Sequence, residues 1–366
     1  MIPFTRPALL DGATKKLHEA LASRRLAGDG PFGRQAEKLL EAELAAKRVL
    51  LTTSCTHALE MAGLLLELQP GDEVIVPAFT FVSTANAFAL RGARVVFGDI
   101  RADTLNLDET RLPITPRTKA IVPVHYAGVG CELDAMMATK LPIVEDNAHG
   151  LFGRYRGKPL GSFGALATQS FHDTKNVTCG EGGALVINDE RFVERAEIIR
   201  EKGTNRSRFF RGQVDKYTWV DIGSSYVLSD LLAAVLVAQL EVREQIQEHR
   251  ARVWTRYASE LADWANSRGV RLPIVPAHCE QTFHMFYLLI PDARRDGFIA
   301  HMKERGVQTV FHYQALNTSP MGIAQGGHVG QCPVTERIAQ ELVRLPLYND
   351  LSDDDVGTVI DAVRAF

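Results

Sequence analysis

The chain has 366 residues, of which 46% are hydrophobic and 23% are charged, and its formal net charge is −3. This length exceeds what one hydrophobic core usually organises, so we expect a globular protein with two domains. The near-neutral charge offers no basic field for a nucleic-acid partner, and no segment approaches the roughly 18 apolar residues that a membrane span needs.

The cysteines and the first residues indicate the compartment. Five scattered cysteines form no C-x-x-C pair and no spacing typical of metal ligands, and the N-terminal residues lack the apolar region of a signal peptide. We therefore expect a cytoplasmic protein with reduced thiols, without a bound metal and without a membrane partner.

Strand-like and helix-like segments alternate over the first half of the chain. Strands are expected at 48–52, 73–77, 92–99, 120–125, 141–146, 165–169 and 184–188, and helices at 34–47, 58–68, 81–90 and 134–139. This alternation predicts an α/β domain with a mainly parallel sheet flanked by helices.

The pattern changes in the second half. A charged helix is expected at 190–202, followed by a long polar and aromatic stretch at 203–223 without periodicity, which is typical of a functional loop. One very long helix at 228–264 then leads into segments of mixed pattern, among them 282–289, 309–313 and 353–365. We predict a large domain at residues 1–240 and a smaller α+β domain at residues 241–366.

Two candidate features lie where strands end, the edge at which ligands collect in a parallel α/β sheet. Ser54-Cys55-Thr56-His57 opens a helix whose free N–H groups suit a phosphate, although an ordinary Ser or Thr cap has the same pattern. Asp146 ends an apolar strand and suits a pyridinium nitrogen, with a plain strand-end acid as the alternative. His149 follows it, either as a partner for a cofactor hydroxyl or as a loop histidine.

Lys175 is the third feature, in a stretch at 170–183 that ends in a glycine-rich turn. A Lys amine becomes a nucleophile when burial or nearby charge lowers its pKa, whereas an isolated Lys in a turn is usually solvated. A phosphate-binding helix, then Asp146, then Lys175, on successive strands, is the arrangement expected of a pyridoxal phosphate enzyme. Phe81 starts a helix and suits stacking on the cofactor ring, with a core Phe as the alternative.

Five segments are similar to those of a known family. They are SCTHALEMA (54–62), GDEVIVPAFTFVSTANA (71–87), VPVHYAG (122–128), IVEDNAHG (143–150) and SFHDTKNVTCGEGGAL (170–185). Through these segments the chain resembles the DegT-type sugar aminotransferases over nearly its whole length. The resemblance implies the type I fold of pyridoxal phosphate enzymes: a large domain with a mainly parallel mixed sheet, a smaller C-terminal α+β domain, and a homodimer that shares its active sites.

The resemblance also implies roles for individual residues. Lys175 would form the Schiff base with pyridoxal 5'-phosphate, and Asp146 would hold the pyridine nitrogen. His149, where relatives often have Gln, would reach the ring hydroxyl, and Phe81 would stack on the ring. Phosphate contacts are implied for Thr56, His57 and Ser170.

The stretch at 200–226 narrows the expected substrate. It is similar to the branch of the family that aminates dTDP-4-keto-6-deoxyglucose with L-glutamate, through the pyridoxamine phosphate form of the cofactor. The product would be dTDP-4-amino-4,6-dideoxygalactose, used for lipopolysaccharide O-antigen or enterobacterial common antigen. Candidate partners of the sugar diphosphate, for which a solvated basic loop is the alternative, are Arg206, Arg208, Arg211 and Lys216.

Two segments depart from the family pattern. Many relatives have Asn-x-Arg-Met where this chain has Ser225-Tyr226-Val227-Leu228, so Ser225 would take the place of the Asn that reaches the cofactor phosphate from the partner subunit. The chain also has His312-Tyr313-Gln314-Ala315-Leu316-Asn317 in place of His-Tyr-x-Pro-Leu-His. His312 and Tyr313 remain candidate substrate contacts.

Rival functions differ in how well the residues fit them. Sugar dehydratases of the same family carry His in place of the catalytic Lys, so Lys175 argues against that chemistry. An aminotransferase that acts at C3, gives an equatorial 4-amine, or uses a UDP- or GDP-sugar would have the same cofactor motifs, and these alternatives stay open. A non-catalytic protein with this fold is disfavoured by the intact Lys175 and Asp146.

Overall fold

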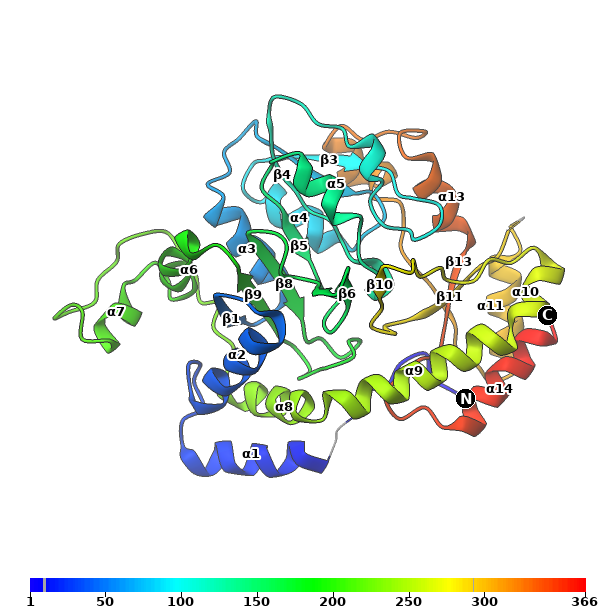
Figure 1. The fold of residues 1–366 in the computed structure, drawn as a ribbon, viewed down its shortest axis with the longest axis horizontal. Coiled ribbons are helices and arrows are strands. Elements are labelled where there is room, and N and C mark those ends of the chain that lie inside the picture. Colours follow the sequence, from blue (N-terminus) through cyan, green and yellow to red (C-terminus); the bar gives the residue numbers. More distant parts are fainter. Residues whose placement is uncertain (9–10, 292) are drawn as a thin grey trace.

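The computed structural model describes residues 1–8, 11–291 and 293–366. A large mixed sheet lies among helices, and a smaller sheet lies beside the C-terminal helices (Figure 1). The strands are β1 (Arg48–Thr52), β2 (Glu73–Pro77), β3 (Arg94–Gly98), β4 (Thr118–Ile121), β5 (Val144–Asp146), β6 (Arg154–Tyr155), β7 (Lys158–Pro159), β8 (Leu166–Ser170), β9 (Gly183–Ile187), β10 (Cys279–Glu280), β11 (Phe286–Leu289), β12 (Val310–Phe311) and β13 (Leu342–Leu345).

The other regular elements of the described chain are mainly α-helices. They are α1 (Asp11–Ser23), α2 (Pro31–Leu44), α3 (Cys55–Leu65), α4 (Val82–Ala89), α5 (Leu133–Ala138), α6 (Val193–Arg200), α7 (Arg206–Phe210), α8 (Asp230–Glu241), α9 (Arg243–Glu260), α10 (Ala262–Arg268), α11 (Arg295–Glu304), α12 (Pro320–Ala324), α13 (Pro333–Glu341) and α14 (Asp353–Arg364). In the part of the chain that the structure describes, no helix is long and apolar enough to cross a bilayer.

The large sheet confirms the predicted α/β class. Parallel pairing gives the order β3-β2-β4, and a second group has the order β1-β9-β8-β5. Parallel bridges at Ile121–Ile143 and Val124–Asp146 join the two groups between β4 and β5. Strand β9 pairs antiparallel with both β8 and β1, whereas β5 pairs parallel with β8, so the sheet is mixed and mainly parallel. Strands β2 and β9 are buried along their whole length, as expected for a sheet that is covered on both faces.

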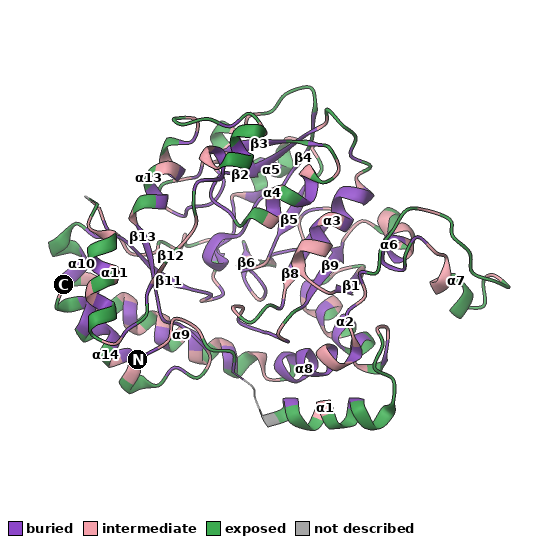
Figure 2. Ribbon diagram, turned by 180° about the vertical axis from the view of Figure 1, so that it is seen from behind, coloured by how far each residue is buried: buried purple, intermediate pink, exposed green. Residues whose placement is uncertain are grey.

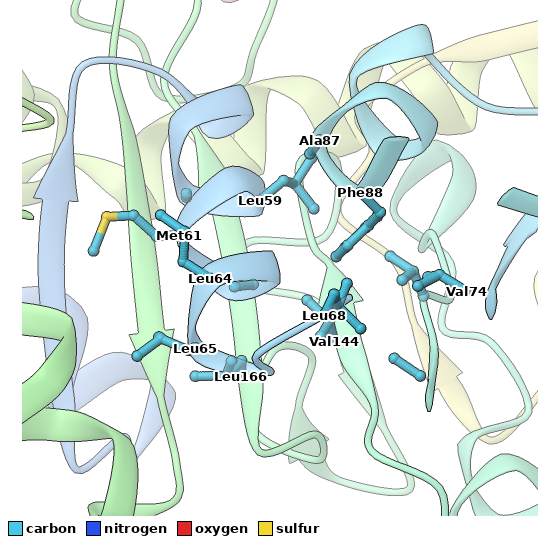
Figure 3. Packing of buried hydrophobic residues seen from close by; sticks show 14 of the residues in the cluster. Leu59, Met61, Leu64, Leu65, Leu68, Val74, Ala87, Phe88, Val144 and Leu166 are labelled. Atoms are coloured by element: carbon cyan, nitrogen blue, oxygen red, sulfur yellow. The ribbon is translucent and has the colours of Figure 1, made fainter. Parts of the chain in front are cut away.

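Helix α3 packs directly on this sheet and positions its own N-terminus beside the strand ends. Figure 3 shows Leu59 and Leu64 of α3 among Phe88 of α4 and Val144 and Leu166 of the sheet, all members of one buried cluster. Burial of a leucine side chain contributes about 2 kcal/mol. This packing therefore fixes where the first turn of α3 presents its N–H groups.

The expected single helix at 228–264 is wrong: the structure divides this segment into α8, α9 and the start of α10. Helix α8 is apolar on all sides and packs against α1 and α2, whereas α9 is charged and buries only one side, including Val253 and Tyr257. At Val242 the backbone leaves helical geometry between α8 and α9. At Leu261 helix α9 ends and α10 begins. Helix α8 can therefore pack in the core of the large sheet, while α9 packs in the core beside the small sheet.

The smaller sheet has the antiparallel order β11-β13-β12. Its buried side chains pack with those of α9, α10, α11 and α14 into a second core, which also takes in Ile2 from the start of the chain. Figure 2 shows β11 and β13 as buried strands in purple, with the exposed faces of the C-terminal helices in green. The boundary at residue 240 stays a prediction.

The stretch expected to lack structure contains one short helix, α7. Residues 204–224, called the α7 arm below, project beyond α6 and away from the rest of the molecule in both ribbon views (Figures 1 and 2). The arm carries large apolar side chains in the open, with Phe210 69% and Trp219 77% exposed. Such exposure is unusual for a surface that faces only water.

Candidate active site

The parallel strands β5 and β8 end side by side and bring polar residues to one edge of the sheet. Asp146, the last residue of β5, pairs in register with Thr168 of β8. Lys175 lies in the loop after β8 and lines a small cavity together with His149 and Ser170. The structure therefore brings four of the predicted cofactor residues to one place.

The N-terminus of α3 lies at the same edge. The Ser54 hydroxyl accepts a hydrogen bond from the His57 N–H at 3.1 Å, and the Thr56 hydroxyl is 2.8 Å from that of Ser83. Gly183 lets β9 approach this turn, because a Cβ there would lie 2.3 Å from the backbone nitrogen of Cys55. Free N–H groups and the positive end of the helix dipole suit a phosphate here.

Asp146 is a buried carboxylate with an unusual set of partners. Its Oδ2 accepts a hydrogen bond of 2.7 Å from the Thr84 hydroxyl, and its Oδ1 accepts one of 3.2 Å from the Ala148 N–H. Among the described residues no cation lies within ion-pair distance of it, although burial of an unpaired carboxylate is costly. The site is thus suited to a bound cation such as a protonated pyridine nitrogen. Thr84 was missed from the sequence, although it lies one turn beyond Phe81 on the same helix.

The amine of Lys175 is prepared for nucleophilic chemistry. Its pKa is lowered from 10.5 to about 8, mainly by burial and to a smaller extent by the charge of Arg344, against the opposing effects of Cys55 and Asp146. Burial disfavours the charged ammonium because the protein solvates it less well than water does. A substantial fraction of Lys175 is therefore neutral, and hence nucleophilic, near physiological pH.

This lowered pKa predicts the pH dependence of cofactor incorporation into the apoenzyme. The protonated amine is unreactive, so the rate should rise about tenfold per pH unit below the pKa and level off above about 8. Stopped-flow absorbance after addition of pyridoxal 5'-phosphate measures this rate. Because Asp146 raises the pKa of Lys175, the D146N variant should show a lower midpoint. A midpoint near 10 in both proteins would contradict the account.

His149 and His284 form a stacked pair beside Lys175. Their ring centroids are 4.3 Å apart with an interplanar angle of 19°. Burial holds the pKa of both imidazoles well below the ordinary value, so both are neutral. Nδ1 of His284 lies 2.9 Å from Oδ1 of Asn176, whereas the buried Nδ1 of His149 has no hydrogen-bond partner among the described residues. His149 therefore has a free polar atom for a bound molecule. No pattern in the sequence marks His284 as part of this site.

Aromatic side chains gather at the opening of this edge. Phe81 caps the start of α4, is 56% exposed, and has its ring 6.3 Å from that of Tyr313. Nδ1 of His312 lies 2.9 Å from the hydroxyl of Tyr126, and the His312 ring lies 6.2 Å from that of His149. Phe81, His312 and Tyr313 thus lie close to the predicted cofactor contacts.

The remaining predicted residues lie elsewhere. Arg211 pairs with Glu197 of α6 at 2.9 Å, and Arg206 lies 3.5 Å from Glu201. Arg208 pairs with Glu194, and Lys216 is exposed; all four basic residues belong to the α7 arm. Ser225 is exposed just beyond the arm. Their roles as substrate or phosphate contacts stay predictions.

Comparison with known proteins agrees with this geometry. The model of the DegT/DnrJ/EryC1/StrS aminotransferase family matches residues 10–364. The spore coat polysaccharide biosynthesis protein SpsC of Bacillus subtilis is 32% identical over 99% of this chain and 96% of its own length.

The chain belongs to the DegT/DnrJ/EryC1/StrS aminotransferase family.

Solved structures of similar aminotransferases extend the comparison. The aminotransferase TlmJ of Streptoalloteichus hindustanus superposes with a TM-score of 0.91 at 32% identity, over 100% of this chain and 98% of the other. The pyridoxal phosphate form of the sugar aminotransferase Spr1654 of Streptococcus pneumoniae gives 0.91 at 27% identity, again over 100% and 98%. The predicted type I fold and the class of enzyme are confirmed. This protein is a sugar aminotransferase that depends on pyridoxal 5'-phosphate.

The described residues fit that cofactor. The N-terminus of α3 matches its phosphate, the buried and uncompensated Asp146 matches its pyridine nitrogen, and the unpartnered Nδ1 of His149 matches its ring hydroxyl. Lys175 supplies the amine, and Phe81 offers an exposed ring at the opening. Each requirement of the aminotransferase cofactor therefore has a counterpart at this edge of the sheet.

Proposed function

We propose that this aminotransferase transfers the amino group of L-glutamate to the C4 ketone of dTDP-4-keto-6-deoxy-D-glucose. The products are dTDP-4-amino-4,6-dideoxy-D-galactose and 2-oxoglutarate, and the pathway is cytoplasmic synthesis of a surface polysaccharide. The observation that carries the proposal is that Lys175, whose pKa is lowered, and the buried Asp146 lie at the same edge of the sheet. The sugar is supported by the similarity of residues 200–226 to one branch of the family and by the relative that serves spore coat polysaccharide synthesis.

Each residue of the site has a separate role in the proposed reaction. When bound, the cofactor ring withdraws electrons from the carbon that carries the amine. Asp146 would keep a proton at the ring nitrogen of the cofactor, and the helix dipole of α3 would help to hold its phosphate. Nζ of Lys175 takes the proton from the amine-bearing carbon of the donor and returns protons on the reverse path with the sugar. The unpartnered Nδ1 of His149 would hydrogen-bond the ring hydroxyl and so orient the ring.

A second copy of the chain is part of the proposal. The α7 arm exposes Phe210 and Trp219, and Ser225 at its base faces outward. A homodimer in which the arm of one subunit covers the site of the other would bury these side chains and bring Arg206 and Arg211 to a sugar diphosphate. Exposed apolar surface of this kind favours an oligomer over a monomer.

The product distinguishes the proposed substrate from its alternatives. We expect purified enzyme, dTDP-4-keto-6-deoxyglucose and glutamate to yield a 4-amino sugar whose amine is axial, as read from proton coupling constants by NMR. UDP- and GDP-linked keto-sugars should react at least about tenfold more slowly, since a specific nucleotide pocket discriminates by a few kcal/mol. An equatorial amine, amination at C3, or no reaction with the dTDP-sugar would overturn this substrate and leave the other family substrates.

A further inference from the structure

Asn176 follows Lys175 directly, and its contacts come from the C-terminal half of the chain. The residue is buried, and its Nδ2 donates hydrogen bonds to the carbonyl oxygen of Thr282 at 2.7 Å and to Oε1 of Gln247 in α9 at 3.2 Å. Its backbone carbonyl oxygen accepts a hydrogen bond of 2.8 Å from Nδ2 of Asn349. Both protons of the side-chain amide are therefore used, and these contacts fix the direction in which the amide points.

This orientation of the amide decides the tautomer of His284. Because Nδ2 of Asn176 is the donor, Oδ1 of Asn176 faces Nδ1 of His284 at 2.9 Å and accepts from it. Nδ1 of His284 therefore carries a proton, since an amide oxygen can only accept. Burial holds the pKa of His284 well below the ordinary value, so the ring is neutral and its Nε2 carries a lone pair. Since the N–H lies in the plane of the imidazole, the same hydrogen bond also sets that plane.

The segment that carries His284 contacts His149 at two points. The Thr282 hydroxyl donates a hydrogen bond of 2.7 Å to the carbonyl oxygen of His149, and the His284 ring stacks on the His149 ring at 4.3 Å and 19°. The packing here is close, because a Cβ at Gly128 would lie 1.8 Å from the hydroxyl oxygen of Thr282. A stacked ring stays nearly parallel to its neighbour. His284 therefore limits the directions in which Nδ1 of His149 can point.

The imidazole of His284 is not needed to hold its own backbone. Arg250 of α9 donates hydrogen bonds to the carbonyl oxygens of Phe283 and His284, at 3.0 and 2.5 Å. These two bonds involve only the main chain of residues 283 and 284, so they do not depend on which side chain stands at position 284. The stacked and hydrogen-bonded imidazole is therefore better explained by the neighbouring ring that it supports.

We propose that Asn176 and His284 are positioning residues for His149, and through it for the ring of the bound cofactor. Asn176 sets the plane of His284, His284 sets the plane of His149, and Nδ1 of His149 then meets the ring hydroxyl. This series of contacts begins at the residue next to Lys175, so the reactive amine and the ring hydroxyl are placed by one group of residues. The inference rests on the cofactor contact proposed for His149, and it is independent of which sugar accepts the amine.

Binding of pyridoxal 5'-phosphate to the apoenzyme tests the proposal without turnover. We expect H284A to raise the apparent Kd about three- to tenfold, because a stacked aromatic pair contributes on that order. H284F keeps a flat ring but loses the hydrogen bond to Asn176, so its Kd should lie between those of H284A and the wild type. F286L is the control: it changes a buried ring of the second core, which should lower the melting temperature but leave the Kd within about twofold.

The visible circular dichroism of the bound cofactor supplies a signature of ring orientation. This band should change in H284A, be partly restored in H284F, and stay as in the wild type in F286L. A merely structural role for His284 would instead lower the melting temperature and leave the band and the Kd unchanged, as expected for F286L. An unchanged Kd in H284A together with an unchanged band would overturn the inference.

A double-mutant cycle shows whether His284 acts through His149. H149A should itself weaken the binding of pyridoxal 5'-phosphate, and the H149A/H284A variant should bind no more weakly than H149A. Losses that add independently would overturn the inference, and so would an H149A variant with the Kd of the wild type. If H284A does not fold, H284F and H149A/H284F complete the same cycle.

The apoenzyme provides a further readout, the tautomer of His284. Nitrogen NMR of isotope-labelled histidine, with the His284 signals assigned by their loss in H284F, should place the proton on Nδ1 in the wild type. The N176A variant removes the acceptor and should show a mixture of both tautomers. A proton on Nε2 of His284 in the wild type would contradict the hydrogen bond from which its orientation follows.

The outcome for His284 is separable from the outcome for the sugar. If the wild type converts glutamate to 2-oxoglutarate but aminates no nucleotide keto-sugar, the proposed function fails, and a non-additive cycle on cofactor binding still supports the inference. If the sugar is aminated and the losses of H149A and H284A add, the inference fails and the function stands.

Discussion

The K175A variant is expected to lose at least about 10⁴-fold of the wild-type turnover, because it loses both the covalent attachment of the cofactor and the group that moves the proton. Its visible absorbance band from bound cofactor should disappear as well, since no amine remains to react with the aldehyde. The measurement is turnover of glutamate with the keto-sugar, together with the absorbance spectrum of the purified protein.

Two variants control for damage to the loop that carries Lys175. K175R keeps a positive charge but lacks a nucleophilic amine, and it should be as inactive as K175A. E181Q changes an exposed residue of the same loop and should stay within about twofold of wild type, as surface substitutions usually do. Turnover by K175A within tenfold of wild type would show that another residue performs the chemistry.

The second large effect is expected at Asp146. D146N keeps the shape of the side chain but removes the charge that holds the proton at the ring nitrogen, and kcat should fall about 10³-fold. T84V removes the 2.7 Å hydrogen bond to Oδ2 and should cost about tenfold, since it disturbs the carboxylate without neutralising it. Steady-state kinetics with both substrates measures the two losses.

The ordering of these two variants is informative. A T84V loss as large as that of D146N would mean that orientation, and not charge, is what Asp146 contributes. Conversely, a D146N enzyme with near wild-type kcat would remove the assigned role of this carboxylate. D189N serves as the control, because Asp189 pairs with Arg191 at the surface, remote from the edge that holds Lys175.

The sequence predicts the sheet well and places Asp146 and Lys175 at one edge of it, for a physical reason. Buried parallel strands read as short apolar runs, and polar residues directly after them mark the edge where ligands bind, so Asp146 and Lys175 stand out by position. The α3 N-terminus was visible through its Ser54 cap. Each of these patterns lies within one short segment, so it can be recognised without knowing how distant segments pack.

Residues whose function depends on distant packing could not be found in the same way. His284 stacks on His149 although the two residues are 135 positions apart in the sequence (284 − 149). Nothing in the segment around His284 indicates that it belongs to the site. Arg344 looks like an ordinary strand residue until the structure shows it buried and unpaired. The break at Val242 was missed because both halves of the predicted helix have helical periodicity, and only their different cores separate them.

The α7 arm is a segment for which the sequence predicts the irregular backbone but not the partners of its side chains. Its lack of periodicity correctly indicated an irregular segment, and its basic residues suggested a diphosphate site. In the isolated chain two of them pair with α6, Arg208 with Glu194 and Arg211 with Glu197 at 2.9 Å. In the proposed homodimer these residues would exchange these partners for the substrate, and a pattern in one sequence does not specify the second subunit that this exchange requires.

The most direct test of the central claim is a half-reaction without the sugar. Wild-type enzyme loaded with pyridoxal 5'-phosphate is mixed with glutamate alone, and the 2-oxoglutarate released is quantified. If Lys175 drives transfer of the amine to a bound cofactor, one equivalent should appear per chain and then stop, and K175A should release none. Continuous release without an acceptor, or a full equivalent from K175A, would contradict the account.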